Sequence, residues 1–243
     1  MQHALDLAAQ AMRITSPNPR VGCVIVNAQG QVIGQGHTQR AGGHHAEIMA
    51  LQDAAHQGHS VEGATAYVTL EPCAHHGKTG PCCDALIQAK VGKVVAALTD
   101  PNPHVAGQGF ERLRAAGIHV EVGDGADPAA AQNPGFLSRM TRKKPWVRLK
   151  IAASLDGQTS LTNGKSQWIT GPEARADGHA WRARACAVLT GIGTVLEDDP
   201  LLDLRLCANL ENPPRMPHLV IVDSRLETPL NAKLFQHSGP KAP

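Results

Sequence analysis

Two short stretches of the chain contain the residue types from which catalytic zinc sites are built. The first, residues 44–47, reads His-His-Ala-Glu, and the second, residues 71–83, contains three Cys. One His and two Cys supply three ligands to a zinc ion and leave its fourth position for water. Zinc lowers the pKa of that water to about 7, so a hydroxide nucleophile is available at neutral pH. The two stretches therefore predict hydrolytic zinc chemistry.

Glu47 supplies the group that would have to move protons in such a reaction. Residues i and i+2 of a helix lie about 200° apart around its axis, so His45 and Glu47 can serve one centre only at a helix N-terminus. Gly43 precedes this point and the apolar residues Ile48 and Leu51 follow it, which predicts a helix that begins here. The pattern H-x-E with a later Pro-Cys is typical of zinc nucleobase deaminases.

The second stretch offers three thiols for two ligand positions. Cys73 follows an expected strand over 66–70, and Pro81 favours a helix start after it. Cys82 would then lie in the first helical turn, where the helix dipole favours a thiolate. Cys83 would point about 100° away from it. We predict that His45, Cys73 and Cys82 bind the metal, with Cys83 as the rival to Cys82.

A structural zinc site, or no metal at all, is the main alternative for these residues. Structural sites are normally closed by four protein ligands, and such a site would give Glu47 no chemical role. H-x-E alone is common, but its combination with two Pro-Cys pairs favours a catalytic site.

The composition limits the other functions that the chain can have. Its 243 residues, 42% of them apolar, can form one large or two modest globular domains. A net charge of +2, with only three Trp, three Phe and one Tyr, argues against a nucleic-acid partner. We expect no signal peptide, no membrane span and no disulfide framework, and hence a cytoplasmic protein.

Alternating elements in the first half of the chain predict a three-layer α/β/α domain over residues 1–144. A helix over 4–12 precedes a hairpin of strands, 21–26 and 31–37. Helices and strands then alternate, with strands at 64–70, 93–98 and 118–122 and a helical tail at 136–140, which calls for parallel pairing. The loop from Asp100 to Pro103 would leave its strand at the edge of the sheet where ligands collect.

The second half of the chain predicts another α/β domain, over residues 145–243. A basic joint, residues 141–145, ends in Pro145 and marks the boundary. We expect strands at 146–152, 187–190 and 218–222, a helix that Pro172 begins, and a loop at 191–194.

Taken together, the motifs resemble those of the bifunctional riboflavin-biosynthesis deaminase/reductase family. Its deaminase half is similar to cytidine deaminases, and its reductase half is similar to dihydrofolate reductase. The matching segments cover nearly the whole chain in order and are residues 15–22, 42–47, 71–83, 100–103, 149–157, 166–170 and 197–200.

For the first half, this resemblance implies a zinc-dependent hydrolytic deaminase. Its substrate would be 2,5-diamino-6-ribosylamino-4(3H)-pyrimidinone 5′-phosphate, a phosphorylated pyrimidine. Glu47 would transfer protons, Asn18 would bind the pyrimidine edge, and His75 and Lys78 would meet the ribose phosphate. Without the family pattern, Asn18 is simply a turn residue between two prolines and Lys78 a solvated loop residue.

For the second half, the resemblance implies NADPH-dependent reduction of the ribosyl group to ribityl. Residues expected near NADPH are Ala152, Trp168, Thr194, Asp198 and Ser224. Those expected near the substrate are Ser166, Arg182, Leu202 and Arg205. The family's reductase half continues past residue 243 into a glycine-rich segment that holds the cofactor pyrophosphate. We therefore expect a truncated reductase domain in a chain that deaminates but reduces poorly or not at all.

Two other functions share some of these features. A tRNA adenosine deaminase would suit residues 45–51, but such enzymes bring their two Cys together as C-x-x-C, whereas eight residues separate Cys73 from Cys82. A non-catalytic binding module could retain zinc as a structural plug. The sequence does not fix the oligomeric state, although related deaminases often form homo-oligomers.

Overall fold

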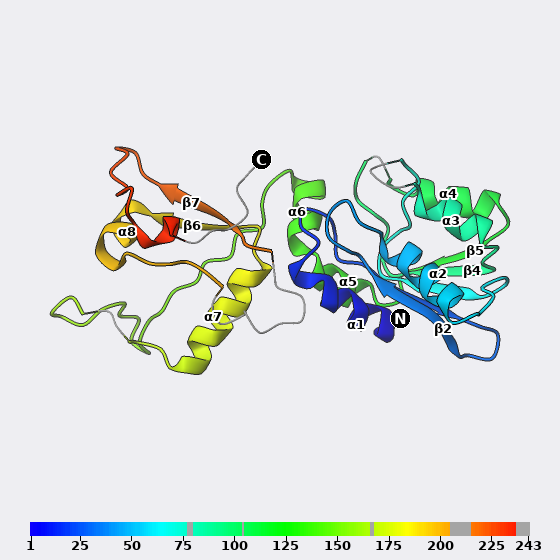
Figure 1. The fold of residues 1–243 in the computed structure, drawn as a ribbon, viewed down its shortest axis with the longest axis horizontal. Coiled ribbons are helices and arrows are strands. Elements are labelled where there is room, and N and C mark those ends of the chain that lie inside the picture. Colours follow the sequence, from blue (N-terminus) through cyan, green and yellow to red (C-terminus); the bar gives the residue numbers. More distant parts are fainter. Residues whose placement is uncertain (77–79, 104, 166–167, 205–214, 237–243) are drawn as a thin grey trace. The chain divides into compact units, whose positions relative to one another are not determined.

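The computed structural model describes residues 1–243 except 77–79, 104, 166–167, 205–214 and 237–243 (Figure 1). The chain divides into two compact units, Met1–Val147 and Arg148–Pro243. Three of the residues singled out in the sequence, Lys78, Ser166 and Arg205, lie outside the described residues.

The first unit is built on a five-stranded mixed sheet with the order β2-β1-β3-β4-β5. Its strands are β1 (Gly22–Val26), β2 (Val32–His37), β3 (Thr65–Val68), β4 (Lys93–Ala96) and β5 (His119–Val122). β1 pairs antiparallel with both β2 and β3, while β3, β4 and β5 are parallel. The expected hairpin and the expected parallel strands are both confirmed.

Helices cover both faces of this sheet. They are α1 (Gln2–Gln10), α2 (Ala46–His56), α3 (Cys82–Gln88), α4 (Gln108–Ala115), α5 (Ala126–Gln132) and α6 (Pro134–Arg142), with a short 3-10 turn at Ala11–Arg13. Alternation along β1 separates the two layers, because Cys23 and Ile25 join the core beneath α2, α3 and α4, whereas Val24 packs with Ala4 and Leu7 of α1. The predicted three-layer α/β/α architecture is confirmed (Figure 1).

Two glycines let α2 lie unusually close to β2. A Cβ at Gly34 would collide with the carbonyl oxygen of Ala50 and come within 2.8 Å of the Ala54 Cβ. A Cβ at Gly36 would come within 2.8 Å of the Ala50 amide nitrogen. The position of α2, and of the residues at its start, is thus set by backbone contact with the sheet.

The second unit contains a two-stranded parallel sheet, β6 (Ala187–Gly191) and β7 (His218–Val222). Its helices are α7 (Pro172–Arg184) and α8 (Ile192–Asp198), and a 3-10 turn spans Lys233–Phe235. Among the described residues of this unit, buried apolar side chains form two small clusters, one around Ala183 and Leu204 and the other around Val195, Ala232 and Leu234.

Two sequence-based expectations for this half of the chain are wrong. Residues 146–152, all of which the structure describes, form no strand, and the apolar side chains that suggested one are exposed, Val147 and Leu149 by 80% each. An alternating pattern becomes a strand only when another strand pairs with it, and no described strand does so. In place of the expected loop at 191–194, Gly191 ends β6 and the next three residues begin α8, where Ile192 packs against the Val195 cluster.

The helices that the structure describes are too short to be membrane spans. The longest, α7, has 13 residues, and none meets the length and apolar character that a bilayer requires.

We predict that Gly34→Ala lowers the free energy of unfolding by about 1–3 kcal/mol, because the new methyl group forces α2 away from β2. Urea denaturation of the purified protein measures this. Gly135→Ala is the matched control, since that exposed glycine in α6 has no atom within 4 Å of the added Cβ. Equal stabilities for the two variants would contradict the close packing of α2.

Candidate metal centre

Three segments that are far apart in the sequence meet near one end of the first sheet, and each brings one metal-ligating side chain. His45 immediately precedes α2, Cys73 lies in the loop after β3, and Cys82 is the first residue of α3. One ligand atom from each of these residues lies within 4.8 Å of the other two. The structure therefore brings together the three predicted ligands.

Helix starts account for the placement of two of these side chains. His45 is the N-cap of α2 and has an extended backbone, with φ −78° and ψ 167°, so its imidazole lies ahead of the first turn. Pro81 is the N-cap of α3 and places Cys82 at the first helical position. Both helix starts agree with the sequence-based expectation.

The distances among the three residues suit a zinc ion. His45 Nδ1 lies 3.7 Å from Cys73 Sγ and 3.3 Å from Cys82 Sγ. A tetrahedral zinc ion with ordinary Zn–N and Zn–S bond lengths separates nitrogen from sulfur by about 3.6 Å. The spacing and the chemistry of this donor set fit zinc, and three ligands leave one position for another molecule.

The rival thiol, Cys83, turns away from this centre. Its Sγ donates a hydrogen bond to the main-chain oxygen of Cys73 at 2.9 Å. Its backbone N–H donates to the same oxygen at 3.2 Å. Cys83 is thus part of the connection between α3 and the Cys73 loop, and Cys82 alone of the pair faces His45.

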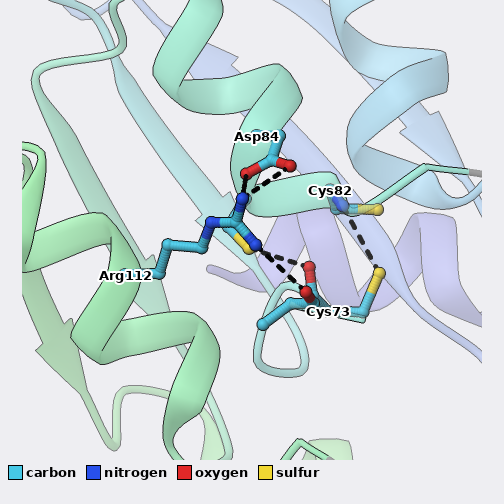
Figure 2. Close-up of polar contacts among 6 residues, drawn as sticks. Cys73, Cys82, Asp84 and Arg112 are labelled. Carbon is cyan, nitrogen blue, oxygen red and sulfur yellow. Dashed lines mark hydrogen bonds and ion pairs between the residues drawn. The ribbon is translucent and has the colours of Figure 1, made fainter. Parts of the chain in front are cut away.

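The two thiols of the centre shift each other's pKa in opposite directions. The pKa of Cys73 is lowered to about 4, chiefly because the Cys82 thiol donates a hydrogen bond to it. The Cys82 backbone N–H, 3.4 Å from Cys73 Sγ, adds to this shift (Figure 2). The His45 side chain also lowers the pKa of Cys73. The pKa of Cys82 is raised because its proton is held in that bond and its side chain is buried.

Glu47 lies beside the centre as the second residue of α2. The residue is only 4% exposed, and it lies among His45, Cys73 and Cys82. Burial, together with the negative charge of Cys73, raises the pKa of Glu47 to about 7. A carboxyl group with such a pKa can both accept and donate a proton near neutral pH.

A cavity of about 400 Å³ opens onto the centre and is lined by His45, Glu47 and Cys73. Asn18 and His75, the expected substrate contacts, line it as well. Asn18 also belongs to a turn, because its backbone N–H donates to the Thr15 oxygen at 2.9 Å. Asn18 is therefore a turn residue that also lines the cavity, and its contact with a pyrimidine edge stays a prediction.

Helix α6 contributes lining residues that sequence analysis did not anticipate. Phe136, Arg139 and Met140 face the cavity, and Arg139 Nη2 donates to the Pro17 oxygen at 3.3 Å. The helical tail was predicted, but nothing in its spacing indicates that it returns to residues 17–19. Only the packing of the layers could reveal this.

Glu71 organises another part of the wall. It lies two residues before Cys73, and its carboxylate accepts hydrogen bonds from the backbone N–H groups of Asp100, Gly107 and Gly109 at 2.9–3.0 Å. This arrangement holds the loop after β4 so that Asp100 and Asn102 line the cavity. The Asp-Pro-Asn-Pro motif was expected at this edge, but the part played by Glu71 was missed.

Asp100 is a second buried carboxyl group in the cavity wall. Burial raises its pKa to about 6, and the nearby Glu71 adds to the shift, although the backbone N–H of Asn102 donates to its Oδ1 at 2.8 Å.

The described residues expected to contact cofactor in the second unit fall into two groups. Thr194 and Asp198 lie four residues apart on α8, directly after β6, and Ser224 follows β7. Because β6 and β7 are parallel, these three residues follow the same edge of the sheet. Ala152 and Trp168 instead belong to the segment before α7, where the Arg175 guanidinium stacks on Trp168 at 4.5 Å.

The expected substrate residues of this unit are partly assembled. Arg182 Nη1 donates to the main-chain oxygen of Asp203 at 2.7 Å, which brings the end of α7 next to Leu202. Leu202 has a left-handed backbone, with φ 51°, which is unusual for this residue type.

Known proteins resemble both halves of this chain. Residues 1–98 match the cytidine and deoxycytidylate deaminase zinc-binding region, and residues 145–242 match the RibD C-terminal domain. The chain is 54% identical over 205 residues to riboflavin biosynthesis protein RibD of Escherichia coli, covering 84% of this chain and 55% of that protein. It is 48% identical over 248 residues to the RibD of Haemophilus influenzae, covering 99% and 66%.

Solved structures agree with these relationships. Acinetobacter baumannii RibD superimposes with a TM-score of 0.91 at 50% identity, covering 97% of this chain and 65% of that one. A Thermotoga maritima diaminohydroxyphosphoribosylaminopyrimidine deaminase/5-amino-6-(5-phosphoribosylamino)uracil reductase gives 0.88 at 39% identity, covering 98% and 66%. The chain thus spans between 55% and 66% of the length of these relatives.

We predict that Asp100→Asn stabilises the metal-free protein more as the pH rises from about 5 to about 7. The folded-state pKa of about 6 lies above the ordinary value, so the favourable contribution of the neutral acid is complete below pH ~4 and is lost as the pH rises through ~6. Asparagine keeps the acceptor for Asn102 and removes the buried charge. Urea denaturation at several pH values measures the difference between variant and parent.

Asp124→Asn, which neutralises an exposed carboxylate, is the control for this comparison and should leave the pH profile unchanged. A stability difference between Asp100→Asn and the parent that stays constant with pH would show that Asp100 is not desolvated.

Proposed function

This chain belongs to the RibD family of riboflavin biosynthesis proteins, and from that membership we propose that its first unit is a zinc-dependent hydrolytic deaminase. The proposed substrate is 2,5-diamino-6-ribosylamino-4(3H)-pyrimidinone 5′-phosphate, which would lose one ring amino group as ammonia. Deamination of this kind requires a water nucleophile and a group that transfers protons.

The observation that carries this proposal is the meeting of His45, Cys73 and Cys82 beside the buried carboxyl of Glu47. Three ligands fit a catalytic zinc better than a structural one, because structural sites are closed by a fourth protein ligand. The cavity is lined by His45, Cys73 and Glu47, and by polar groups that could orient a substrate. When bound, zinc would supply an activated water molecule at neutral pH.

Glu47 is the proposed proton carrier. Its carboxyl group is buried next to the ligands, where it could accept a proton from water and deliver it to a ring nitrogen. The same carboxyl could then protonate the departing amino group, so that one residue serves both halves of the reaction. Its burial keeps bulk water from competing for these protons.

The cavity wall supplies the proposed substrate contacts. The side-chain amide of Asn18 offers both a donor and an acceptor to the pyrimidine edge. His75 is proposed to approach the ribose phosphate together with Lys78. Arg139 of α6 adds a positively charged side chain to the lining of the same cavity.

For the whole protein we propose a second activity, NADPH-dependent reduction of the ribosyl group to ribityl. The match of residues 145–242 to the RibD C-terminal domain supports it. Thr194, Asp198 and Ser224 follow one edge of the β6–β7 sheet and are the proposed contacts for NADPH, together with Ala152 and Trp168. Arg182 and Leu202, with Ser166 and Arg205, are the proposed contacts for the substrate.

We predict that Glu47→Gln slows ammonia release from the diaminopyrimidine ribotide by about 10²–10⁴-fold, because the amide cannot transfer protons. Zinc content, measured by atomic absorption, should stay at the parent's level, since Glu47 is not among the three ligands. Equal turnover of both proteins would rule out Glu47 as the proton carrier. A zinc-loaded parent that releases no ammonia would favour a non-catalytic binding module.

We predict that Cys82→Ser weakens zinc binding by more than about 100-fold, since even partners behind the ligands contribute 10- to 100-fold. Cys83→Ser should retain zinc, because a serine hydroxyl can also donate to the Cys73 oxygen. A chelator competition with both variants measures the affinities. Weakened zinc binding in Cys83→Ser but not in Cys82→Ser would identify Cys83 as the ligand.

A further inference from the structure

The spacing between the two thiols depends on how the start of α3 is held against the loop that carries Cys73. Within the described residues, direct contacts join these segments at Cys82 N–H to Cys73 Sγ and at Cys83 to Cys73 O. All of these contacts involve the thiol-bearing residues themselves. A separate support is provided by α4.

Arg112 on α4 reaches both segments at once (Figure 2). Its Nη2 lies 2.7 Å from Oδ1 and 2.9 Å from Oδ2 of Asp84, two residues after Cys82. Its Nη1 donates to the main-chain oxygen of Ala74 at 3.2 Å, one residue after Cys73. One guanidinium therefore connects the neighbours of both thiols.

We propose that Arg112 is a positioning residue of the metal centre, which fixes the separation of Cys73 and Cys82 by binding Asp84 and the Ala74 carbonyl together. This inference rests on the zinc site proposed above and adds to it a residue that touches neither metal nor substrate. It assigns to the Arg112–Asp84 ion pair a function in zinc affinity.

The chemistry of the side chain suits this role. Guanidinium is planar and presents several N–H groups in a fixed geometry, so its orientation toward Asp84 also fixes its orientation toward Ala74. A lysine ammonium carries the same charge but has no rigid fork. The contact with a backbone carbonyl matters in particular, because it restrains the main chain beside Cys73 directly.

Because the Arg112–Asp84 ion pair is partly exposed, its effect on zinc affinity can be distinguished from an effect on the stability of the fold. The side chains of Arg112 and Asp84 are 45% and 26% exposed, and ion pairs near the surface contribute little to folding. Loss of the pair should therefore change the ligand geometry more than the stability of the fold. Metal affinity typically falls 10- to 100-fold when a partner behind the ligands is removed.

The test compares zinc affinities by competition with a chromogenic chelator in the full chain. Arg112→Gln should bind zinc about 10- to 100-fold more weakly than the parent. Arg112→Lys should lie between the two, and Asp84→Asn, which breaks the same contact from the other side, should also weaken binding. The double variant should be no weaker than the weaker single variant, because both remove one interaction.

Two further measurements make the result specific. The urea midpoint of metal-free Arg112→Gln should stay close to the parent's, and the visible absorption bands of bound Co²⁺ should shift because the ligand geometry changes. Lys90→Gln is the matched control, since it breaks an exposed ion pair with Glu62 at 3.3 Å on the same unit and should leave zinc affinity unchanged.

Unchanged zinc affinity in both Arg112→Gln and Asp84→Asn, when Cys82→Ser loses zinc, would overturn this inference and leave the proposed function intact. A fall in zinc affinity matched by an equal fall in metal-free stability would also overturn it, since Arg112 would then be a general structural residue. Failure of the folded parent to bind zinc would overturn the proposed function and the inference together.

Discussion

The first unit depends on one requirement, that an imidazole and two thiols from distant segments meet at a single point. Such groups do not approach one another without a cause, because bringing them out of water costs solvation that only hydrogen bonds or a metal can replace. The fold meets this requirement by starting two helices at the same place, so that His45 caps α2 and Cys82 opens α3. The Cys73 loop lies between them and accepts backbone N–H groups from α3.

Other contacts in the first unit hold the segments around this metal centre in place. Gly34 and Gly36 allow backbone contact between α2 and β2, which fixes where the helix carrying Glu47 begins. Glu71 holds the loop after β4 through three backbone N–H groups, and thereby shapes the cavity wall. Because the glycines allow close contact with the α2 main chain and Glu71 holds three main-chain N–H groups, the backbone around the site is fixed before any ligand binds.

The second unit shows when a local pattern of apolar residues predicts a strand or helix correctly and when it does not. Strands β6 and β7 and the helix that Pro172 begins were all expected, since each has a continuous apolar run or a distinct start signal, whereas the parallel pairing of the two strands was not predicted. Residues 146–152 carry an equally clear alternation and yet form no strand, because no described strand pairs with them. The periodicity of apolar residues shows which side chains could share one face of a strand. Hydrogen-bonded pairing with a neighbouring strand decides whether that strand forms.

Sequence alone determined the order of the five strands in the first unit, its three-layer architecture, the residue types of the centre and the placement of His45 and Cys82 at helix starts, whereas helix α5 was not expected. These features follow from local rules of periodicity and capping, which act over a few residues. Only the tertiary structure decided that Cys82 rather than Cys83 faces His45, that α6 returns Arg139 to the cavity, and that Arg112 lies between Asp84 and Ala74. These contacts join residues separated by up to about 120 positions, and only the packing of helices on a shared sheet sets such distances.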